Sequence, residues 1–359
     1  MDEIIHHPNK GARLEDKEVI IISGSSGLIG YPLIKRLAKN YRVVGLDRLG
    51  PPYPPLQAEC VNFDITDEKA IDAAMERIRY GYGSKIASVI HLAAFYSFNT
   101  KDSPGYDEIN VKGTRKFLNQ LQDFEIDQFI FSSSDLIYKP VEPGVKIHEN
   151  CPIEANWGYP ESKVITEDLI KENNKDIDSV FLRIAGIYDD MGHSIPISQQ
   201  IKRIYEKEFI SHFYSGDMEH GDVFVHLEDV LDAIERTVAK RNELPNELAL
   251  NIGEPETPTY KELQDRIGKL IHTDEHWETH EVPKSIAKMG AWTRDLIGDP
   301  FIKPWMIDRA DDHYELDISR AWKYIGWEPK HRLMDTLPEI VKNLKEDPEA
   351  WYKENNLEK

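Results

Sequence analysis

The chain has 359 residues, and its 64 acidic against 44 basic side chains give a formal net charge of −20. This charge disfavours nucleic acid or an anionic membrane as a partner, because both attract basic surfaces. The two cysteines are too few for a disulfide framework or a cysteine zinc site, and they predict reduced thiols in the cytoplasm. Residues 1–17 are expected to form a polar extension, and no apolar stretch approaches the ~20 residues of a membrane span.

A strand followed by a glycine-rich turn is the first predicted element. The continuous apolar run at residues 19–22 is typical of a strand buried on both faces. Gly24 permits a tight turn, Gly27 permits close approach of a pyrophosphate, and Gly30 lets the next helix lie against the strand. The free amides at that helix start predict a dinucleotide site, although an ordinary strand–turn–helix has the same pattern. Further cofactor contacts are expected from Ser26, Leu28 and Ile29.

A second apolar run, residues 41–46, ends at Asp47, which follows the glycines by about 20 residues. In a dinucleotide fold an acid at this point binds the adenosine ribose hydroxyls. It favours NAD as the cofactor because it repels the 2′-phosphate of NADP, while Arg48 beside it leaves NADP open. After a short third strand at residues 60–63, Asp64 and Ile65 are predicted to contact the adenine. The alternative for Asp64 is a cap on the helix expected at residues 67–80.

The fourth predicted strand, residues 86–92, runs into a ligand-facing loop. Leu92, Ala93 and Ala94 are predicted cofactor contacts, because small side chains there let a cofactor lie against the backbone. Phe95, Tyr96 and Phe98 follow, and they form either a substrate wall or simple packing.

The next helix and strand also end in polar residues. Residues 106–124 have helical periodicity and carry Asn110, a predicted cofactor contact. The strand predicted at residues 129–133 runs out into Ser132, Ser133, Ser134 and Asp135. Because ligands of open α/β sheets bind beyond the carboxyl ends of the strands, these hydroxyls are expected to face the site.

Tyr159 and Lys163 lie four residues apart at the start of a predicted helix, with Pro160 in its first turn. A lysine ammonium beside a phenol lowers the tyrosine pKa from ~10, and such a tyrosine can exchange a proton with a substrate hydroxyl near neutral pH. The alternative is a surface Tyr–Lys pair. The preceding nucleotide-binding pattern and serine cluster favour the catalytic interpretation.

Together these motifs resemble the extended short-chain dehydrogenase/reductases, the NAD-dependent epimerase/dehydratase group. The similar segments are the glycine turn, Asp47, residues 64–65, 91–94 and 110–114, the serine-rich strand end, Tyr159-x-x-x-Lys163, and residues 182–188, 224–230, 317–321 and 325–329. The resemblance covers residues 18–340. It implies an α/β fold: a Rossmann doubly wound parallel sheet with a smaller, mixed α/β C-terminal substrate-binding domain.

The resemblance also implies roles for single residues. Tyr159 would be the general acid/base, Lys163 would hold the nicotinamide ribose and tune Tyr159, and Ser134 would hydrogen-bond the reacting oxygen. Ser133 is the next candidate for that serine, and Ser132 is expected to add a cofactor contact. Substrate contacts are expected from Tyr96, Ser134, Asp135 and Gly186.

Several positions depart from the family pattern. Leu136 follows Asp135 where sugar dehydratases have a glutamate, which argues against dehydration. Gly186 and Asp222 stand where many nucleotide-sugar enzymes have an asparagine and an arginine on the phosphates, and Asp189 replaces the glycine of Tyr-Gly-Pro. Because an acid repels a diphosphate, these departures lower the expectation of a nucleotide-sugar substrate.

The predicted dinucleotide domain comprises residues 18–188 and 223–257, and the predicted substrate domain comprises 189–222 and 258–345. Helices are expected at 198–209, 227–240 and 260–271, with a strand at 248–252. Trp292, Phe301, Trp305 and Met306 would close over the substrate or form a small second core. His272, His276 and His280 have metal-ligand spacing only if they are helical, and we predict no metal.

Three functions are consistent with these residues. The first is an NAD(P)-dependent oxidoreductase acting on a small-molecule alcohol, ketone or sugar. The second is a nucleotide-sugar C4-epimerase with retained NAD, and the third is a non-catalytic NAD(P)-sensing binding protein. The resemblance further suggests a homodimer through the helices at 110–124 and 159–173.

Overall fold

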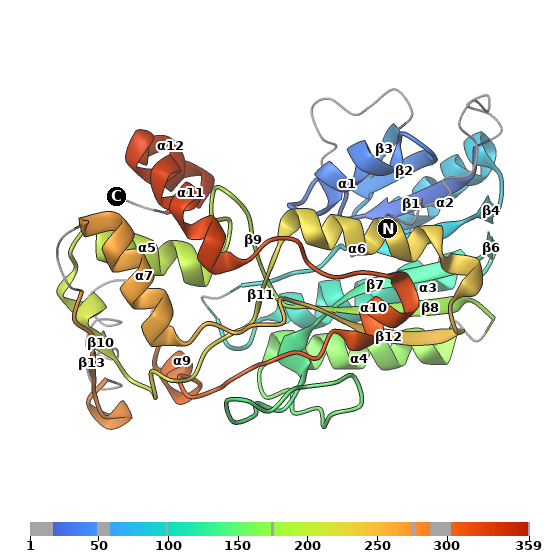
Figure 1. The fold of residues 1–359 in the computed structure, drawn as a ribbon. Coiled ribbons are helices and arrows are strands. Elements are labelled where there is room, and N and C mark those ends of the chain that lie inside the picture. Colours follow the sequence, from blue (N-terminus) through green and yellow to red (C-terminus); the bar gives the residue numbers. More distant parts are fainter. Residues whose placement is uncertain are drawn as a thin grey trace.

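The computed structural model of the chain describes residues 17–48, 58–97, 100–173, 176–273, 277–287 and 303–357 (Figure 1). Most of the expected N-terminal extension lies outside these residues, as do Phe98, His276, Trp292 and Phe301. Figure 1 shows a central sheet with its helices on one side of the molecule and α5, α7, α11 and α12 gathered on the other.

A seven-stranded sheet forms the larger part. Its order is β12-β8-β7-β5-β1-β2-β3, and every neighbouring pair is parallel. The strands are β1 (Val19–Ser23), β2 (Arg42–Asp47), β3 (Ala58–Asn62), β5 (Ser88–His91), β7 (Gln128–Ser134), β8 (Asp178–Ile184) and β12 (Glu247–Ile252). The predicted doubly wound parallel sheet is confirmed.

Strand β1 lies between β2 and β5, so the direction in which the chain adds strands reverses beside it. The carboxyl ends of β1 and β5 meet at Ser23 and His91, which are register partners. In open α/β sheets ligands bind in the crevice outside such a reversal point. The glycine turn that follows β1 is therefore placed where a dinucleotide binds.

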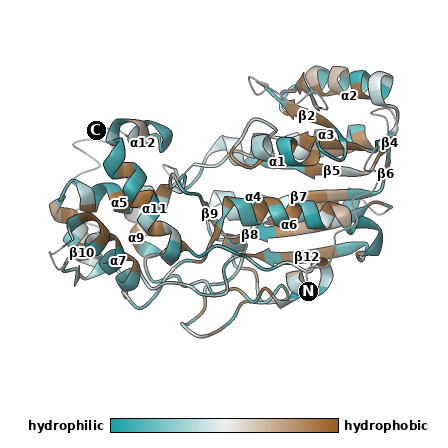
Figure 2. Ribbon diagram, turned by 45° about the horizontal axis from the view of Figure 1, so that its top comes forward, coloured by the Kyte–Doolittle hydropathy of each residue, from teal (hydrophilic) through white to brown (hydrophobic). Residues whose placement is uncertain are grey.

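Alternate residues of β1 supply two separate cores, because successive side chains of a strand point to opposite faces. Ile20 and Ile22 pack with α1 (Gly30–Leu37) and α6 (Leu227–Ala239). Val19 and Ile21 pack with α2 (Glu68–Tyr82), α3 (Thr114–Leu121) and α4 (Gly158–Asn173). Figure 2 shows the hydrophobic residues on the strands between helices that carry both hydrophobic and hydrophilic residues. Helices thus cover both faces of the sheet.

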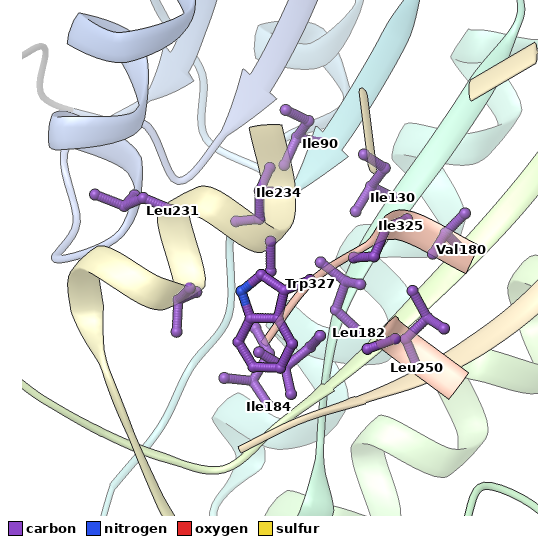
Figure 3. Packing of buried hydrophobic residues seen from close by; sticks show 14 of the residues in the cluster. Ile90, Ile130, Val180, Leu182, Ile184, Leu231, Ile234, Leu250, Ile325 and Trp327 are labelled. Atoms are coloured by element: carbon purple, nitrogen blue, oxygen red, sulfur yellow. The ribbon is translucent and has the colours of Figure 1, made fainter. Parts of the chain in front are cut away.

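Trp327 anchors a late segment of the chain to this sheet. Its indole lies among aliphatic side chains of the sheet and α6, including Leu182, Ile184 and Ile234 (Figure 3). The indole Nε1–H donates to the Asp229 carbonyl oxygen at 2.9 Å. Tyr314, Leu316, Ala321 and Ile325 join the same core, with the last two on α10 (Ser319–Ile325). The domain boundaries proposed from the sequence stay a prediction.

The smaller part is built around a third core. Its helices are α5 (Ile195–Tyr205), α7 (Tyr260–His272), α11 (Leu333–Glu346) and α12 (Pro348–Glu354), and β10 (Phe213–Tyr214) pairs in parallel with β13 (His280–Glu281). The mixed composition agrees with the expected second part.

Short elements complete the described chain. They are β4 (Lys85–Ile86), β6 (Glu125–Ile126), β9 (Gly186–Tyr188), β11 (Phe224–His226), α9 (Pro304–Asp308), the π-helix η2 (Tyr106–Gly113), and the 3₁₀ turns η3 (Asp135–Ile137), η4 (Phe209–His212) and η5 (Arg241–Glu243). The helix expected at residues 106–124 is present as η2 followed by α3. Its first half is π-helical, a form that is frequent at functional sites.

Candidate active site

The turn between β1 and α1 depends on two of its three glycines for packing. Gly24 has a positive φ of +73°, and a β-carbon there would lie 2.7 Å from the backbone nitrogen of Ala93. A β-carbon on Gly30 would collide with the backbone of Gly24 and Ser25. Gly27 is different: it is exposed, and a β-carbon there would meet only the Gly24 oxygen, at 3.5 Å. The turn leaves open the position at which the sequence predicts a pyrophosphate.

Asp47 is fixed beside this turn at the end of β2. Its two carboxylate oxygens accept the backbone N–H groups of Ser26 at 2.9 Å and Arg48 at 2.8 Å. Each oxygen keeps a further lone pair for a ribose hydroxyl. Leu28 next to the turn is 40% exposed although it is apolar. An open glycine cradle, a positioned acid and an uncovered leucine fit a dinucleotide.

Asp64 and Ile65 follow β3 at the same edge of the sheet. Asp64 Oδ1 accepts the N–H and the hydroxyl of Thr66 at 2.9 and 2.7 Å, and these bonds lower its pKa. Helix α2 is capped by Asp67, which accepts the Lys69 N–H at 3.0 Å. The capping alternative for Asp64 is therefore wrong, because Asp64 stabilises the turn before the cap. The adenine contact stays a prediction.

A buried chain of side chains holds the loop after β5. His91 Nδ1 lies 2.5 Å from the Ser23 hydroxyl, and His91 Nε2 lies 2.7 Å from Thr114 Oγ1. Burial and the nearby Lys163 lower the pKa of His91 to about 3, so the imidazole is neutral. The Ser23 hydroxyl also accepts the Ala93 N–H at 3.3 Å. These bonds set the backbone of the predicted cofactor contacts Leu92 to Ala94.

The side chain of Asn110 joins three segments around the site. Its Oδ1 accepts the Phe95 N–H at 2.7 Å, and its Nδ2 donates to the Phe95 carbonyl at 3.1 Å and to the Ser162 hydroxyl at 2.9 Å. We call this group of bonds the Asn110 clasp. It connects η2 to the loop after β5 and to α4. Asn110 therefore positions these segments, in addition to its predicted contact with the cofactor.

Tyr159 and Lys163 share one face of α4, as their spacing predicts. The Lys163 ammonium lies 5.5 Å from the centre of the Tyr159 ring and donates to the Ser132 carbonyl oxygen at 2.6 Å. Burial lowers the pKa of Lys163 to about 7.

The expected lowering of the Tyr159 pKa is wrong. Burial is the main cause that raises the pKa of Tyr159, and the nearby Asp135 raises it further, while the hydrogen bond from Ser134 acts in the opposite direction. A buried lysine whose own pKa has fallen supplies little positive charge to its neighbour.

The adjacent serines at the end of β7 have different partners. The Ser133 hydroxyl lies 2.5 Å from Glu167 Oε1, and Glu167 forms a buried ion pair with Arg183 at 2.8 Å. Ser134 is the serine whose hydroxyl lowers the pKa of Tyr159. It also donates to Asp135 Oδ1 at 3.3 Å. Of the two candidates, Ser134 faces the tyrosine.

Aromatic side chains surround the Tyr159 ring. The ring centre of Tyr96 lies 4.6 Å from that of Tyr159, and Trp157 lies 5.7 Å away. Trp305 on α9 lies 5.3 Å from Trp157, so part of the predicted closing segment reaches this group. Tyr96 therefore lies in an aromatic wall with Trp157 and Tyr159, and its contact with substrate stays a prediction.

Acidic and basic groups from the later part of the chain lie near Asp135 and act on one another. Asp222 is open to solvent, yet the surrounding protein and Asp312 raise its pKa to about 6. Arg309 lies 2.7 Å from Asp312 and donates to the Tyr314 hydroxyl at 3.0 Å. Arg309 also lowers the pKa of Asp222. Sequence reasoning missed Arg309, because no motif marks it.

Gly186 lies on β9, which pairs with β11. It is exposed, and a β-carbon there would lie 2.9 Å from the Phe224 ring. Only its backbone is available for the predicted substrate contact.

The sheet, the glycine turn, Asp47 and the Ser–Tyr–Lys group define a dinucleotide-dependent enzyme of the extended short-chain dehydrogenase/reductase type. A model of the NAD-dependent epimerase/dehydratase family matches residues 20–253. The chain belongs to this family. Membership excludes the non-catalytic sensor as the main interpretation, and the expectation of NAD as cofactor agrees with it.

Several relatives match nearly the whole chain. A candidate UDP-glucose 4-epimerase of Methanocaldococcus jannaschii is 29% identical over 94% of this chain and 99% of its own. A UDP-glucuronate 4-epimerase of Thermodesulfobacterium geofontis is 24% identical over 93% of this chain and 96% of its own.

The UDP-glucuronic acid 4-epimerase of Bacillus cereus, solved with UDP-glucuronic acid and NAD, has a TM-score of 0.69 to this structure. It is 20% identical, and the match covers 91% of this chain and 99% of that one. At this identity the likeness shows the fold alone.

None of the helices among the described residues is both long and apolar enough to cross a membrane. The same residues hold no group of three or more His, Cys, Asp or Glu side chains suited to a metal ion.

Proposed function

We propose that the protein epimerises a nucleotide-linked sugar at a secondary alcohol carbon, with Tyr159 as the acid/base and NAD as a retained cofactor. The observation that carries the proposal is the placement of Tyr159 and Lys163 on one face of α4, where the Lys163 ammonium lies 5.5 Å from the centre of the Tyr159 ring and donates to the Ser132 carbonyl oxygen at the end of β7. Two relatives that match along almost their whole length are named as 4-epimerases, which supports the epimerase over the oxidoreductase expected first from the sequence.

The residues that would hold NAD lie along the sheet edge. The glycine turn would receive the pyrophosphate, Asp47 the adenosine ribose hydroxyls, and Lys163 the nicotinamide ribose. When bound, the nicotinamide supplies a reversible hydride acceptor. An acid at residue 47 repels a 2′-phosphate, so NAD is favoured over NADP.

The chain's own residues would handle the proton and the substrate. Tyr159 would remove the proton from the reacting hydroxyl and return it, while Ser134 would orient the same oxygen by a hydrogen bond. The aromatic wall of Tyr96 and Trp157 would exclude water from the reacting face. Tight retention of the dinucleotide would then let the sugar be reduced again from its other face.

Arg309 would bind the diphosphate of the substrate. Its guanidinium is held by Asp312 and Tyr314 and acts on the charge of Asp222. Arg309 is the cation of this wall, and it lies beside the acids Asp312 and Asp222. Guanidinium groups bind phosphate by paired hydrogen bonds.

A net oxidoreductase on a sugar, alcohol or ketone without a diphosphate is the second candidate. Asp222 and Gly186 favour it, because they stand where many nucleotide-sugar enzymes bind phosphate. A homodimer and a cytoplasmic location also stay predictions for either function.

Turnover of UDP-sugars followed by proton NMR tests the proposal. The epimerase would convert UDP-glucose or UDP-glucuronate to the 4-epimer with no sustained change in absorbance at 340 nm. An enzyme that instead produces free NADH in proportion to product, from a substrate without phosphate, would favour the second candidate. Tyr159→Phe should abolish the reaction while NAD binding persists.

A further inference from the structure

We propose that Glu167 is a positioning residue of the active site: it fixes the part of α4 that carries Lys163 against the end of β7. Glu167 acts through Lys163 and Tyr159 and does not itself touch the reacting atoms. The inference rests on the proposed function, in which Lys163 holds the nicotinamide ribose and Tyr159 exchanges the proton.

Two successive residues of β7 are bonded to two successive turns of α4. The Lys163 ammonium donates to the Ser132 carbonyl oxygen at 2.6 Å. One turn further along the helix, Glu167 Oε1 accepts the Ser133 hydroxyl at 2.5 Å. Because residues four apart lie on one face of a helix, both bonds hold the same face of α4 against the same strand end. Ser134, the candidate catalytic serine, is the next residue of that strand.

Strand β8 supplies a further partner for the carboxylate. Arg183 Nε donates to Glu167 Oε1 at 3.1 Å, and Arg183 Nη2 donates to Glu167 Oε2 at 2.8 Å. Such a paired arrangement fixes the direction of a carboxylate as well as its distance. Arg183 is also the register partner of Ser133 in the sheet. Glu167 therefore joins α4 to two neighbouring strands at once.

The guanidinium of Arg183 is held on its remaining side as well. Its Nη1 donates to the Tyr138 hydroxyl at 2.8 Å and to the Glu149 carbonyl oxygen at 2.9 Å. The Tyr138 hydroxyl donates in turn to Asn251 Oδ1 at 2.7 Å, which lies on the edge strand β12. The chain of bonds that begins at Glu167 therefore extends across the sheet.

The junction is buried, because Glu167, Lys163, Ser133 and Arg183 are each at most 5% exposed. Separating a buried ion pair leaves an uncompensated charge in the interior, so the paired arrangement is strongly preferred to others. The carboxylate also favours the charged form of Lys163: burial lowers the pKa of Lys163 to about 7, and the negative charge of Glu167 acts against this lowering. Glu167 thus acts on Lys163 through its charge as well as through the placement of α4.

Nucleotide binding by the full-length protein, freed of retained NAD, is the first test. NAD would reach Lys163 through its nicotinamide ribose, whereas ADP ends before that ribose. In Glu167→Gln we expect NAD to bind about tenfold more weakly, because Lys163 is no longer held in place, and ADP to bind as in the natural protein. Calorimetric titration compares the two ligands. Unchanged NAD binding, or equal losses for NAD and ADP, would overturn the proposal.

Reduction of bound NAD in a single turnover with UDP-glucose or UDP-glucuronate is the second test. Misplaced catalytic groups slow the reaction in every folded molecule, so Glu167→Gln should lower the rate constant by about 10²-fold. A role in stability alone would reduce the fraction of protein that reacts and leave the rate constant of the folded molecules unchanged. That second pattern would overturn the proposal.

Two further variants are controls. Asp168→Asn removes the same charge from the next residue of α4, whose side chain is 67% exposed, and should change neither NAD binding nor the rate constant. Glu167→Asp keeps a charge for Arg183 but is shorter by one methylene, so it should fold and lower the rate constant by about tenfold. A natural rate constant in Glu167→Asp would contradict the positioning role even if Glu167→Gln does not fold.

The outcomes separate this role from the proposed function. If Tyr159→Phe keeps full activity, or if the natural protein converts no UDP-sugar, the proposed function fails, and the comparison of NAD with ADP still tests the effect of Glu167 on Lys163. If Tyr159→Phe is inactive but both Glu167 variants keep the natural rate constant and NAD affinity, only the positioning role is wrong.

Discussion

The Ser133 hydroxyl lies 2.5 Å from Oε1 of Glu167, while the hydroxyl of the next residue, Ser134, donates to Asp135 Oδ1 at 3.3 Å and lowers the pKa of Tyr159. Successive side chains of a strand point to opposite sides, so one residue of register separates a structural serine from a candidate catalytic one. Glu167, the partner of Ser133, also forms an ion pair with the buried Arg183. Ser133 therefore belongs to a buried structural network.

The two serines should therefore respond differently to the same substitution. Ser133→Ala should lower the free energy of unfolding by roughly 1.5–3 kcal/mol, because a buried bond to a charged group is lost, and should leave kcat within a few-fold. Ser134→Ala should lower kcat by about 10²-fold with little change in stability. Urea unfolding and steady-state kinetics of both variants measure this. Equal kinetic losses in the two variants would contradict the assignment.

Asp47→Asn should weaken NAD binding by about tenfold, because a ribose hydroxyl loses a charged acceptor worth ~1.4 kcal/mol. The variant keeps an oxygen for the Ser26 N–H, so the turn should stay formed. It should also bind NADP less poorly, since the repulsion of the 2′-phosphate is removed. Calorimetric titration with both dinucleotides measures this. An unchanged preference for NAD would show that Asp47 does not set it.

Asp222→Arg tests the substrate side of the site. A second cation near Arg309 should tighten the binding of UDP by about tenfold if the diphosphate lies between the two side chains. Asp222→Asn is the matched control, because it removes the negative charge without adding a positive one. Fluorescence titration with UDP compares them. Weaker binding in the arginine variant would argue for a substrate without phosphate at this position.

Glu254 should make stability depend on pH. It is buried, accepts the Tyr188 hydroxyl at 2.8 Å and the Leu333 N–H at 3.0 Å, and burial raises its pKa to about 7. Because the native pKa lies above the unfolded value, this contribution is fully present below pH ~4.5 and is lost as the pH rises through 7.

Glu254→Gln does not titrate at this position and should cancel that loss. Relative to the variant, the natural protein should lose on the order of 3 kcal/mol of unfolding free energy between pH 4.5 and 8. Urea unfolding at the two pH values measures it, with Glu256→Gln as an exposed control. A constant difference between natural and variant protein would contradict a raised pKa.

Much of the fold follows from patterns that extend over few residues. The apolar run at residues 19–22 and the acid at residue 47 predict β1, β2 and their shared edge, because buried parallel strands leave a continuous apolar signal. The spacing of Tyr159 and Lys163 likewise places them on one face of α4. Such local regularities survive in the folded chain because neighbouring residues determine them.

What the sequence hides are relationships between distant residues. The direction of the Tyr159 pKa depends on burial and on Asp135, neither of which its spacing to Lys163 reveals. Arg309 meets the acids of the substrate wall only through the path of the chain after α7. The sequence alone does not show whether Asp64 caps α2 or stabilises the turn before it. In the structure Asp67 is the N-cap of α2, so Asp64 stabilises the turn.

The Asn110 clasp joins two walls of the site, so a displacement of one wall is transmitted to the other. A ligand that pushes on the loop carrying Tyr96 also pulls, through one amide, on the helix that carries Tyr159. Binding of a ligand in one half of the crevice then changes the binding free energy of a ligand in the other half. By linkage, this effect is equal in both directions. Asn110 would thereby make the affinity for each reactant depend on whether the other is bound.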